Sequence, residues 1–260
     1  LGDGSVLNKS SPVKIGTSSW TAIAAGASHS MGILTTGALY TWGWGTSGQL
    51  GDGFTISRSS PVQIGTSSWT AIAAGATHSM GILTTGALYT WGLGTSGQLG
   101  DGGTVSRSSP VHVGASSWTA VSTGSAYSMG ILTTGALYAW GFNTYSLGDG
   151  VTTSASSPVQ VGTSSWIAIS AGYSPISGGV AEIPILIDNS YILNGWGPHG
   201  YILPSNISSP VQVGTSSWIA IAAGSGHSMG ILTTGALYTW GIDGAGPVSY
   251  THLTLPTILL

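Results

Sequence analysis

The chain has 260 residues, no cysteine, a formal net charge of −3 and only 4% charged residues. This length can bury a core without disulfides, so the missing cysteines leave the redox compartment undecided. Four cations are too few for the phosphate contacts of a nucleic-acid-binding protein, and no apolar run reaches the ~20 residues of a membrane-spanning helix.

Internal repeats dominate the sequence. The tryptophans of five Ser-Ser-Trp triplets are spaced by 49, 49, 48 and 52 residues, at Trp20, Trp69, Trp118, Trp166 and Trp218. The eleven residues SMGILTTGALY occur four times without a change, at 30–40, 79–89, 128–138 and 228–238. The repeats occupy residues 1–243, in approximate units 1–43, 44–92, 93–141, 142–197 and 198–243.

Each unit has the period-two pattern of short β-strands. In the first unit this pattern predicts strands over 20–25, 29–34 and 38–43, with a glycine turn at 35–37. A fourth strand is expected at each SSPV segment, at a sheet edge where the missing N–H of proline is tolerated. No unit has a 3.6-residue apolar stripe of useful length, so the chain is predicted to be all-β.

Both faces of these strands carry apolar or small residues, where a half-exposed sheet would carry charged ones. Such sheets have to be covered on both sides. Four-stranded sheets that pack on copies of themselves describe propeller blades or a stacked solenoid. The same interface then recurs between every pair of neighbouring sheets. Its residues are uncharged, because an unpaired buried ion would cost several kcal/mol at each interface.

Three segments follow the pattern A-A-G-x-x-H-S, namely IAAGASHSMGI (23–33), IAAGATHSMGI (72–82) and IAAGSGHSMGI (221–231). With the following ALYTWG and GQLGDG, they resemble the repeat of the RCC1 (regulator of chromosome condensation) family. Kelch repeats, which have a Gly-Gly doublet, and WD repeats, which have Trp-Asp where this chain has Trp-Gly, fit less well. The residues that match the RCC1 repeat signature are Gly26, His29, Trp42, Gly75, His78, Trp91, Gly124, Trp140, Gly172, Trp196, Gly224, His227 and Trp240.

The resemblance implies a β-propeller, which in this family has typically seven blades. Because the chain has about five repeats, we expect an incomplete or open array and a fragment of a longer protein. A closed five-bladed ring, formed by pairing 1–19 with the last blade, is the alternative.

Two segments depart from the repeat. The fourth unit replaces the eleven residues with a longer segment at 171–197, in which extra residues precede a hairpin with its turn at 188–190. The tail 244–260 ends the repeat abruptly and resembles translated sequencing-adaptor read-through, so we expect it to be non-native or poorly ordered.

Neither a metal site nor a catalytic site is predicted. His29, His78 and His227 share one position of the repeat, which Tyr127 takes in the third unit, so we expect ring hydrogen bonds to nearby backbone and no metal. Paired carboxylates, nucleophile elbows and phosphate loops are absent from the sequence, so we predict a non-enzyme without cofactors. One Asp of each LGDG segment is expected to cap its own turn, at Asp3, Asp52, Asp101 and Asp149.

Two regions are candidates for partner contact. Lys9, Arg58 and Arg107 each lie three residues before the proline of their unit, which would place them at equivalent points on three blades. The insertion of the fourth unit is the second region, since loops on a rigid frame carry function, and its candidate residues are Tyr173, Glu182 and Asp188. Solubilising loop charges and drift of the repeat are the alternatives.

Three functions are compatible with these features. The first is a non-enzymatic scaffold that binds a protein or glycan, and its neutral Ser/Thr/Gly-rich surface suggests a cell-surface, secreted or virus-particle component. The second, implied by the resemblance, is guanine-nucleotide exchange on the small GTPase Ran with chromatin association. The third is a purely structural repeat array. An open terminal blade would also offer an edge for self-association.

Overall fold

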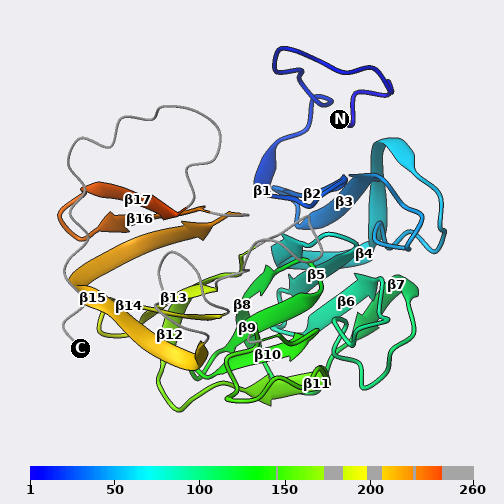
Figure 1. Ribbon diagram of the computed structural model, residues 1–260. Helices are drawn as coiled ribbons and strands as arrows, with labels where there is room; N and C mark the ends of the chain where they lie inside the picture. Colours follow the sequence, from blue (N-terminus) through cyan, green and yellow to red (C-terminus); the bar gives the residue numbers. More distant parts are fainter. Residues whose placement is uncertain (145, 173–183, 198–206, 225–226, 242–260) are drawn as a thin grey trace.

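The computed structural model describes residues 1–144, 146–172, 184–197, 207–224 and 227–241 (Figure 1). These residues form seventeen β-strands and no α-helix, which confirms the all-β prediction for this part of the chain. No helix long and apolar enough to cross a membrane therefore occurs among them.

The strands form five antiparallel blades, named here in chain order and described from the inner to the outer strand. Blade 1 contains β1 (Trp20–Ala25), β2 (His29–Leu34), β3 (Ala38–Gly43) and the first part of β4 (Arg58–Ala74). Blade 2 contains the second part of β4, β5 (His78–Leu83), β6 (Leu88–Gly92) and β7 (Arg107–His112). Blade 3 contains β8 (Trp118–Thr123), β9 (Tyr127–Leu132), β10 (Leu137–Gly141) and β11 (Ala155–Gln160).

The last two blades follow the same plan. Blade 4 contains β12 (Trp166–Ser170), β13 (Ile185–Asp188), β14 (Ile192–Gly197) and the first part of β15 (Ile207–Ala223). Blade 5 contains the second part of β15, β16 (His227–Leu232) and β17 (Leu237–Gly241). Each of the first four blades thus takes its outer strand from the start of the following sequence unit.

β4 and β15 are unusually long because each belongs to two blades. The part of β4 up to Ser68 pairs with β3, and the part from Trp69 pairs with β5. The sequence patterns predict these two parts as separate strands and miss the continuous backbone between them. Four of the five SSPV prolines lie in outer strands, as predicted, at Pro61, Pro110, Pro158 and Pro210. The prediction is wrong for the first SSPV segment, since Pro12 lies outside any strand.

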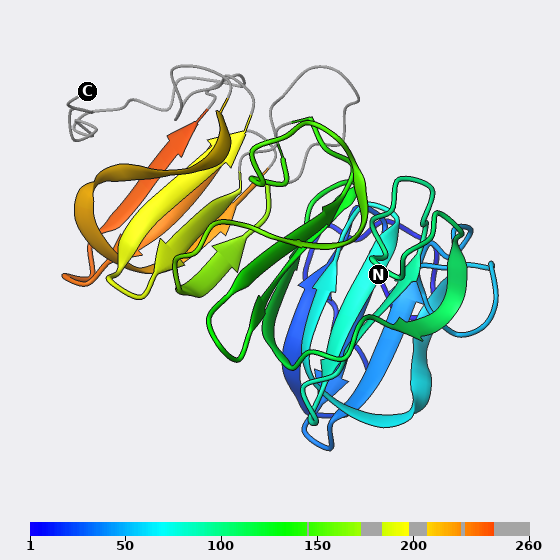
Figure 2. The ribbon, with the colours of Figure 1, turned by 90° about the horizontal axis from the view of Figure 1, so that it is seen from below.

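The blades follow one another around an open arc. The inner strands of successive blades contact each other in the order β1, β4, β8, β12 and β15. β1 lies apart from β16 and β17, as Figure 2 shows, and β17 pairs only with β16 among the described residues. The array is therefore open, as expected, and the alternative of a closed five-bladed ring is wrong for this structure.

The hydrophobic core consists of four seams between neighbouring blades. In the first seam, Met31, Ile33 and Leu39 of blade 1 pack with Trp69 and Trp91 of blade 2. We call the Met-Ile-Leu side of a blade its forward face, and the side with two tryptophans its rear face. The second seam is built from the same positions of blades 2 and 3, with Met80, Ile82, Leu88, Trp118 and Trp140.

A glycine in the second strand of a blade makes room for the inner tryptophan of the rear face. The ring of Trp69 lies so close to Gly81 that a Cβ there would be 2.6 Å from two of its carbons, Cε3 and Cζ3. Trp69 then meets Trp91 edge-to-face, with ring centroids 5.8 Å apart, a geometry that aromatic pairs prefer. Glycines with the same role are Gly32, Gly130 and Gly230.

Gly81→Ala should therefore lower the free energy of unfolding by about 1–3 kcal/mol, because the new methyl group overpacks the seam. Gly103→Ala is the matched control, since its Cβ would have 3.5 Å to the nearest atom, Asp101 Oδ1, and it should change stability by less than ~0.5 kcal/mol. Urea unfolding of both variants measures the effect. Equal stability of the two would contradict this account of the seam.

Candidate functional site

One backbone carbonyl holds each of the first two seams together. The carbonyl of Gln49 accepts hydrogen bonds from Ser79 Oγ at 2.8 Å and from Trp91 Nε1 at 2.9 Å. The same Ser79 Oγ lies 2.8 Å from Nε2 of His29, which belongs to the preceding blade. The second seam repeats this arrangement with His78, Ser128, Gln98 and Trp140.

The hydrogen-bond network fixes the tautomer of these histidines. The hydroxyl of Ser79 donates its single proton in the hydrogen bond to the Gln49 carbonyl, so Oγ accepts a hydrogen bond from Nε2–H of His29. Burial lowers the pKa of His29 to about 4 and that of His78 to about 3. Both rings are therefore neutral near pH 7, and they bond a serine side chain of the next blade. For Nε2 of His29 and His78 the partner is thus a serine hydroxyl, where nearby backbone was expected.

The glycine three residues before each histidine leaves room for the imidazole ring, because it has no side chain. A Cβ at Gly26 would lie 2.6 Å from Cε1 of His29 and 2.4 Å from the carbonyl oxygen of Gly75. The ring and the next blade thus approach the Gly26 backbone more closely than any side chain allows, which explains the Gly-x-x-His spacing. Gly75, Gly124 and Gly224 also lie against the ring at the histidine position, where a Cβ would be 2.6, 1.9 and 2.9 Å from its nearest ring atom.

The third seam uses different residues. Its histidine position holds Tyr127, whose hydroxyl donates to the carbonyl of Gly172 at 3.2 Å. The register of β13 places Pro184 where blade 3 has Ser128, so a histidine would meet no hydroxyl there. Trp196 keeps its role and donates to the carbonyl of Ser146 at 3.0 Å.

The two end blades complete the account of the signature residues. Nε1 of Trp42 and of Trp240 has no hydrogen-bond partner among the described residues. In blade 2 the acceptor is the carbonyl of Gln49. The equivalent position for Trp42 would precede Leu1, and that for Trp240 falls outside the described part of the chain. His227 is exposed on the forward face of blade 5.

The three candidate cations form ion pairs within their own loops. Arg58 Nη2 lies 2.6 Å and Arg107 Nη2 2.9 Å from an Asp carboxylate, and Lys9 Nζ lies 3.4 Å from one. The acidic partners, Asp52, Asp101 and Asp3, are only 4–8% exposed, whereas the cationic side chains are 28–42% exposed. A partner approaching these loops would therefore meet the cations and not the carboxylates.

The same carboxylates cap their own turns, as predicted. Asp52 Oδ1 accepts from the backbone N–H of Phe54 at 3.1 Å, and Asp149 Oδ1 does so from Val151 at 3.2 Å. The fourth unit has Ala155 in place of the cation, and Asn143 Nδ2 lies 3.2 Å from Asp149 Oδ1 instead. Equivalent caps are made by Asp3 and Asp101.

Large apolar side chains are exposed on the loops that follow the third strand of blades 1, 2 and 3. Trp44, Phe54 and Ile56 come from the β3–β4 loop, and Val105 occupies the position of Ile56 in the β6–β7 loop. We call this set, together with the paired cations, the loop face; its other exposed apolar members are Leu7, Phe142 and Val151. This face was not predicted from the sequence, although apolar residues follow Trp-Gly or Gly-Asp-Gly in several units, at Trp44, Phe54, Phe142 and Val151.

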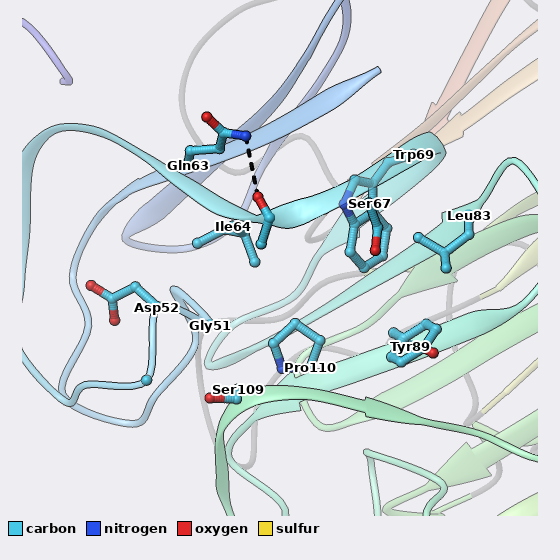
Figure 3. A pocket seen from close by; sticks show the side chains of 12 residues that line it. Gly51, Asp52, Gln63, Ile64, Ser67, Trp69, Leu83, Tyr89, Ser109 and Pro110 are labelled. Atoms are coloured by element: carbon cyan, nitrogen blue, oxygen red, sulfur yellow. Dashed lines mark hydrogen bonds between the residues drawn. The ribbon is translucent and has the colours of Figure 1, made fainter. Parts of the chain in front are cut away.

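A groove occurs at equivalent positions of the first two blades. The groove of blade 2 encloses about 350 Å³ between the LGDG loop, the middle of β4 and β7 (Figure 3). Trp69, Tyr89 and Pro110 line it, and the equivalent residues Trp20, Tyr40 and Pro61 line a groove of about 360 Å³ on blade 1. Asp52 borders the groove, but its carboxylate is already held by Arg58.

The remaining candidates contribute little to a site. Asp188 lies at the end of β13 and caps the hairpin turn, accepting from the backbone N–H of Ser190 at 2.9 Å, as the predicted turn requires. Tyr173 and Glu182 lie outside the described residues. Within the described ranges, no three His, Cys, Asp or Glu residues are placed to hold a metal ion.

Comparisons with known proteins agree with this geometry. Two descriptions of the regulator of chromosome condensation (RCC1) repeat match, one at residues 36–82 and 85–131, the other at 20–49, 69–98 and 218–246. Together they cover more than half of the chain, and the chain belongs to the RCC1 repeat family. It is an open, incomplete RCC1-type β-propeller. No curated protein sequence matches it.

Solved structures show the same fold. Human WBSCR16 is 16% identical, with a TM-score of 0.77 over 92% of this chain and 65% of that protein. Prp20p from Saccharomyces cerevisiae, studied with its binding properties to Gsp1p and histones, is 18% identical, with a TM-score of 0.71 over 85% of this chain and 57% of that protein. The chain thus spans 57–65% of the length of these two proteins.

The buried histidines make stability depend on pH. The unfolded chain binds protons at its histidines below the ordinary pKa of 6.5, whereas folded His29 and His78 do so only near pH 4 and pH 3. The free energy of unfolding should therefore reach its full value above about pH 6.5. It should fall between pH 6.5 and pH 4, by up to ~1.4 kcal/mol per pH unit for each of these two histidines.

Urea unfolding between pH 4.5 and 6.5 measures how steeply the free energy of unfolding depends on pH. The substitution His78→Gln should reduce this slope by about half. The double variant His29→Gln/His78→Gln should be flatter still. An unchanged slope in the double variant would show that these rings do not titrate on unfolding.

Proposed function

We propose that this chain is a non-enzymatic scaffold that binds a protein through its loop face. The observation that carries the proposal is the exposure of Trp44, Phe54, Ile56 and Val105 on consecutive loops of a rigid frame. Exposed apolar side chains that gather on one surface, with polar groups around them, are typical of protein interaction sites. Tryptophan and arginine in particular are enriched among residues that dominate binding.

The charges on the loop face indicate what the partner should offer. Arg58 and Arg107 keep exposed guanidinium groups above buried carboxylates. Arg58 also lies over the ring of Phe54, 5.5 Å from its centroid. We therefore expect a partner segment that combines apolar or aromatic side chains with carboxylates. Lys9 would make the same contact on the first loop.

A protein partner is favoured over a glycan, because the grooves of the first two blades offer neither an exposed aromatic face nor a free carboxylate. Binding of sugars calls for free polar groups around an accessible aromatic face. Trp69 is only 5% exposed, and the Asp52 carboxylate at the rim is engaged by Arg58. Nucleotide exchange on a Ran-type GTPase is the alternative, since Prp20p was studied with Gsp1p. A cell-surface or virus-particle location remains a prediction.

A random peptide library displayed on phage tests the proposal, because it presents many combinations of amino-acid side chains at once. We expect enrichment of peptides that combine acidic and aromatic residues, with binding reduced at least about tenfold by Trp44→Ser/Ile56→Ser/Val105→Ser. The matched control is Ile167→Ser/Ile219→Ser, which removes similarly exposed apolar side chains from inner strands. Equal losses in both variants would contradict a role for the loop face.

The alternative function has its own test. The purified chain should not accelerate release of a fluorescent guanine nucleotide from Gsp1p or Ran. Acceleration that saturates with the concentration of the chain would favour exchange activity over a plain scaffold.

A further inference from the structure

The hairpin between β13 and β14 in blade 4 contains a strained residue. Tyr191 has a φ of +64° and is 48% exposed, and it is the only residue other than glycine with a positive φ in the described part of the chain. Its N–H donates to the carbonyl of Asp188 at 2.9 Å. The other hairpins have a glycine that makes the same contact, at Gly37, Gly86, Gly135 and Gly235. Tyrosine is disfavoured in this left-handed conformation, so it makes the turn less stable than glycine would.

Two isoleucines are exposed beside this hairpin. Ile167 and Ile219 follow the inner tryptophans of blades 4 and 5 and are 50% and 53% exposed. Blades 1–3 have threonine at this position, and its hydroxyl donates to a carbonyl of the second strand at 3.2–3.3 Å, at Thr21, Thr70 and Thr119. Isoleucine cannot make this hydrogen bond, and it exposes an apolar side chain to water instead.

The exposure of this position does not come from the end of the array. Ile167 belongs to blade 4, and its strand β12 contacts β15 of blade 5, yet Ile167 is about as exposed as Ile219. Thr70 and Thr119 are exposed too, although each lies in a blade with a neighbour on both sides. The position therefore faces solvent in every described blade.

The backbone places the three side chains at one end of blades 4 and 5. Ile167 follows the residue of β12 that pairs with Asp188, where the hairpin begins. The carbonyl of Tyr191 accepts from the N–H of Trp218 at 2.8 Å, and Ile219 is the next residue. This end of the blades lies opposite the loop face, because hairpins precede the third strands and the loops of that face follow them. We call Ile167, Tyr191 and Ile219 the hairpin patch.

A carboxylate borders the hairpin patch. Asp188 is the only charged residue in the strands β12 to β17, and the sequence has no lysine or arginine after Arg107. Its Oδ1 accepts from the backbone N–H groups of Ser190 and Ile192, at 2.9 and 3.0 Å. Its Oδ2 has a single contact of 3.5 Å with Asn194 Nδ2, so it can still accept hydrogen bonds from a partner. A complementary partner therefore brings a positive charge.

We propose that the hairpin patch is a second protein-binding surface, for a segment that carries apolar side chains next to a lysine or arginine. Each residue of the patch replaces a threonine or glycine that suits the free chain better, and the three replacements lie at one end of two neighbouring blades. A partner that covers them would remove their apolar area from water, as in other protein interaction sites. The proposal does not depend on the loop face, whose cations call for the opposite charge in a partner.

Peptide selection on a chain without the loop-face side chains tests the proposal. The variant Trp44→Ser/Ile56→Ser/Val105→Ser serves as the target, so that peptides for the loop face are not selected. From a random peptide library displayed on phage, we expect enrichment of peptides that combine lysine or arginine with apolar residues. A selection without enrichment, or one that yields acidic peptides, would overturn the proposal and leave the function proposed for the loop face intact.

The selected peptides are then measured on chains with an intact loop face. Ile167→Ser/Ile219→Ser should weaken their binding at least about tenfold. The matched control is Phe142→Ser/Val151→Ser, which removes apolar side chains of 47% and 49% exposure from the loop face and should leave binding unchanged. All four side chains are exposed, so folding should persist, which circular dichroism checks. Equal binding to both double variants would overturn the proposal.

The charge of Asp188 is tested by Asp188→Asn. The amide oxygen of asparagine can still cap the turn, so the fold should be kept while the charge is lost. Binding of the basic peptides should weaken about two- to fivefold and lose its dependence on salt. Unchanged affinity and unchanged salt dependence would show that the patch does not select a positive charge, against the proposal.

Tyr191→Gly separates binding from stability. Glycine suits the positive φ of this turn, so the variant should unfold at a higher urea concentration than the unchanged chain. The same variant should bind the selected peptides more weakly, because the aromatic ring is lost from the patch. A residue that serves only the fold would not lower affinity while raising stability, and unchanged affinity would exclude Tyr191 from the surface that we propose.

Discussion

The shared carbonyl of Gln49 is the contact on which the order of the first two blades depends. A carbonyl oxygen has two lone pairs, and here both go to blade 2, one to Ser79 and one to Trp91. This arrangement holds the loop that leaves blade 1 and aligns the serine with His29 at the same time. A typical hydrogen bond contributes only ~1 kcal/mol net, but a buried donor left without its acceptor costs ~1–3 kcal/mol. A change at any member of the set therefore penalises two blades.

The third seam shows how this constraint limits variation. Where the following blade has Pro184 in place of the serine, the preceding blade has Tyr127 in place of histidine. Tyrosine is longer and reaches past the missing hydroxyl to the carbonyl of Gly172. The two substitutions make physical sense only together, because a histidine at 127 would have neither a serine to bond nor water to solvate it.

Much of this architecture was predictable from the sequence, because it depends on local patterns. The strands at 20–25, 29–34 and 38–43 have the predicted bounds, and the Asp turns follow from glycine spacing alone. The partner of His29 was not predicted, since Ser79 lies 50 residues away. The signal was nevertheless present: neighbouring residues of a strand face opposite sides, so a His-Ser doublet presents histidine to one neighbour and serine to the other.

The ion pairs were also missed, although their two members lie close together in the sequence. Each cation follows its aspartate by six residues in one loop, for example Arg58 after Asp52, and the pairing recurs in three units. The hypothesis of a partner contact at Lys9, Arg58 and Arg107 left this pairing out, although an aspartate precedes each cation in the sequence. The exposed apolar residues of the loop face were missed for another reason: nothing in the sequence distinguishes a loop residue that faces solvent from one that packs on its own blade.

The separation of seams from loops also shows where a function can vary. Each seam residue has to fit its own blade and the neighbouring blade, which limits the residue types allowed there. The His29–Ser79 and His78–Ser128 hydrogen bonds, which repeat from one seam to the next, are examples. Loop residues have to fit only their own turn. The Asp cap and the glycines of that turn occupy a few positions, and the other loop positions can hold different residue types. The residue after Trp-Gly is accordingly Trp44 in one unit and Phe142 in another, while the strands between them are copied. Selection for a partner can act on such positions without disturbing the frame, and for this reason the loop face, rather than the invariant signature, is where recognition should be sought.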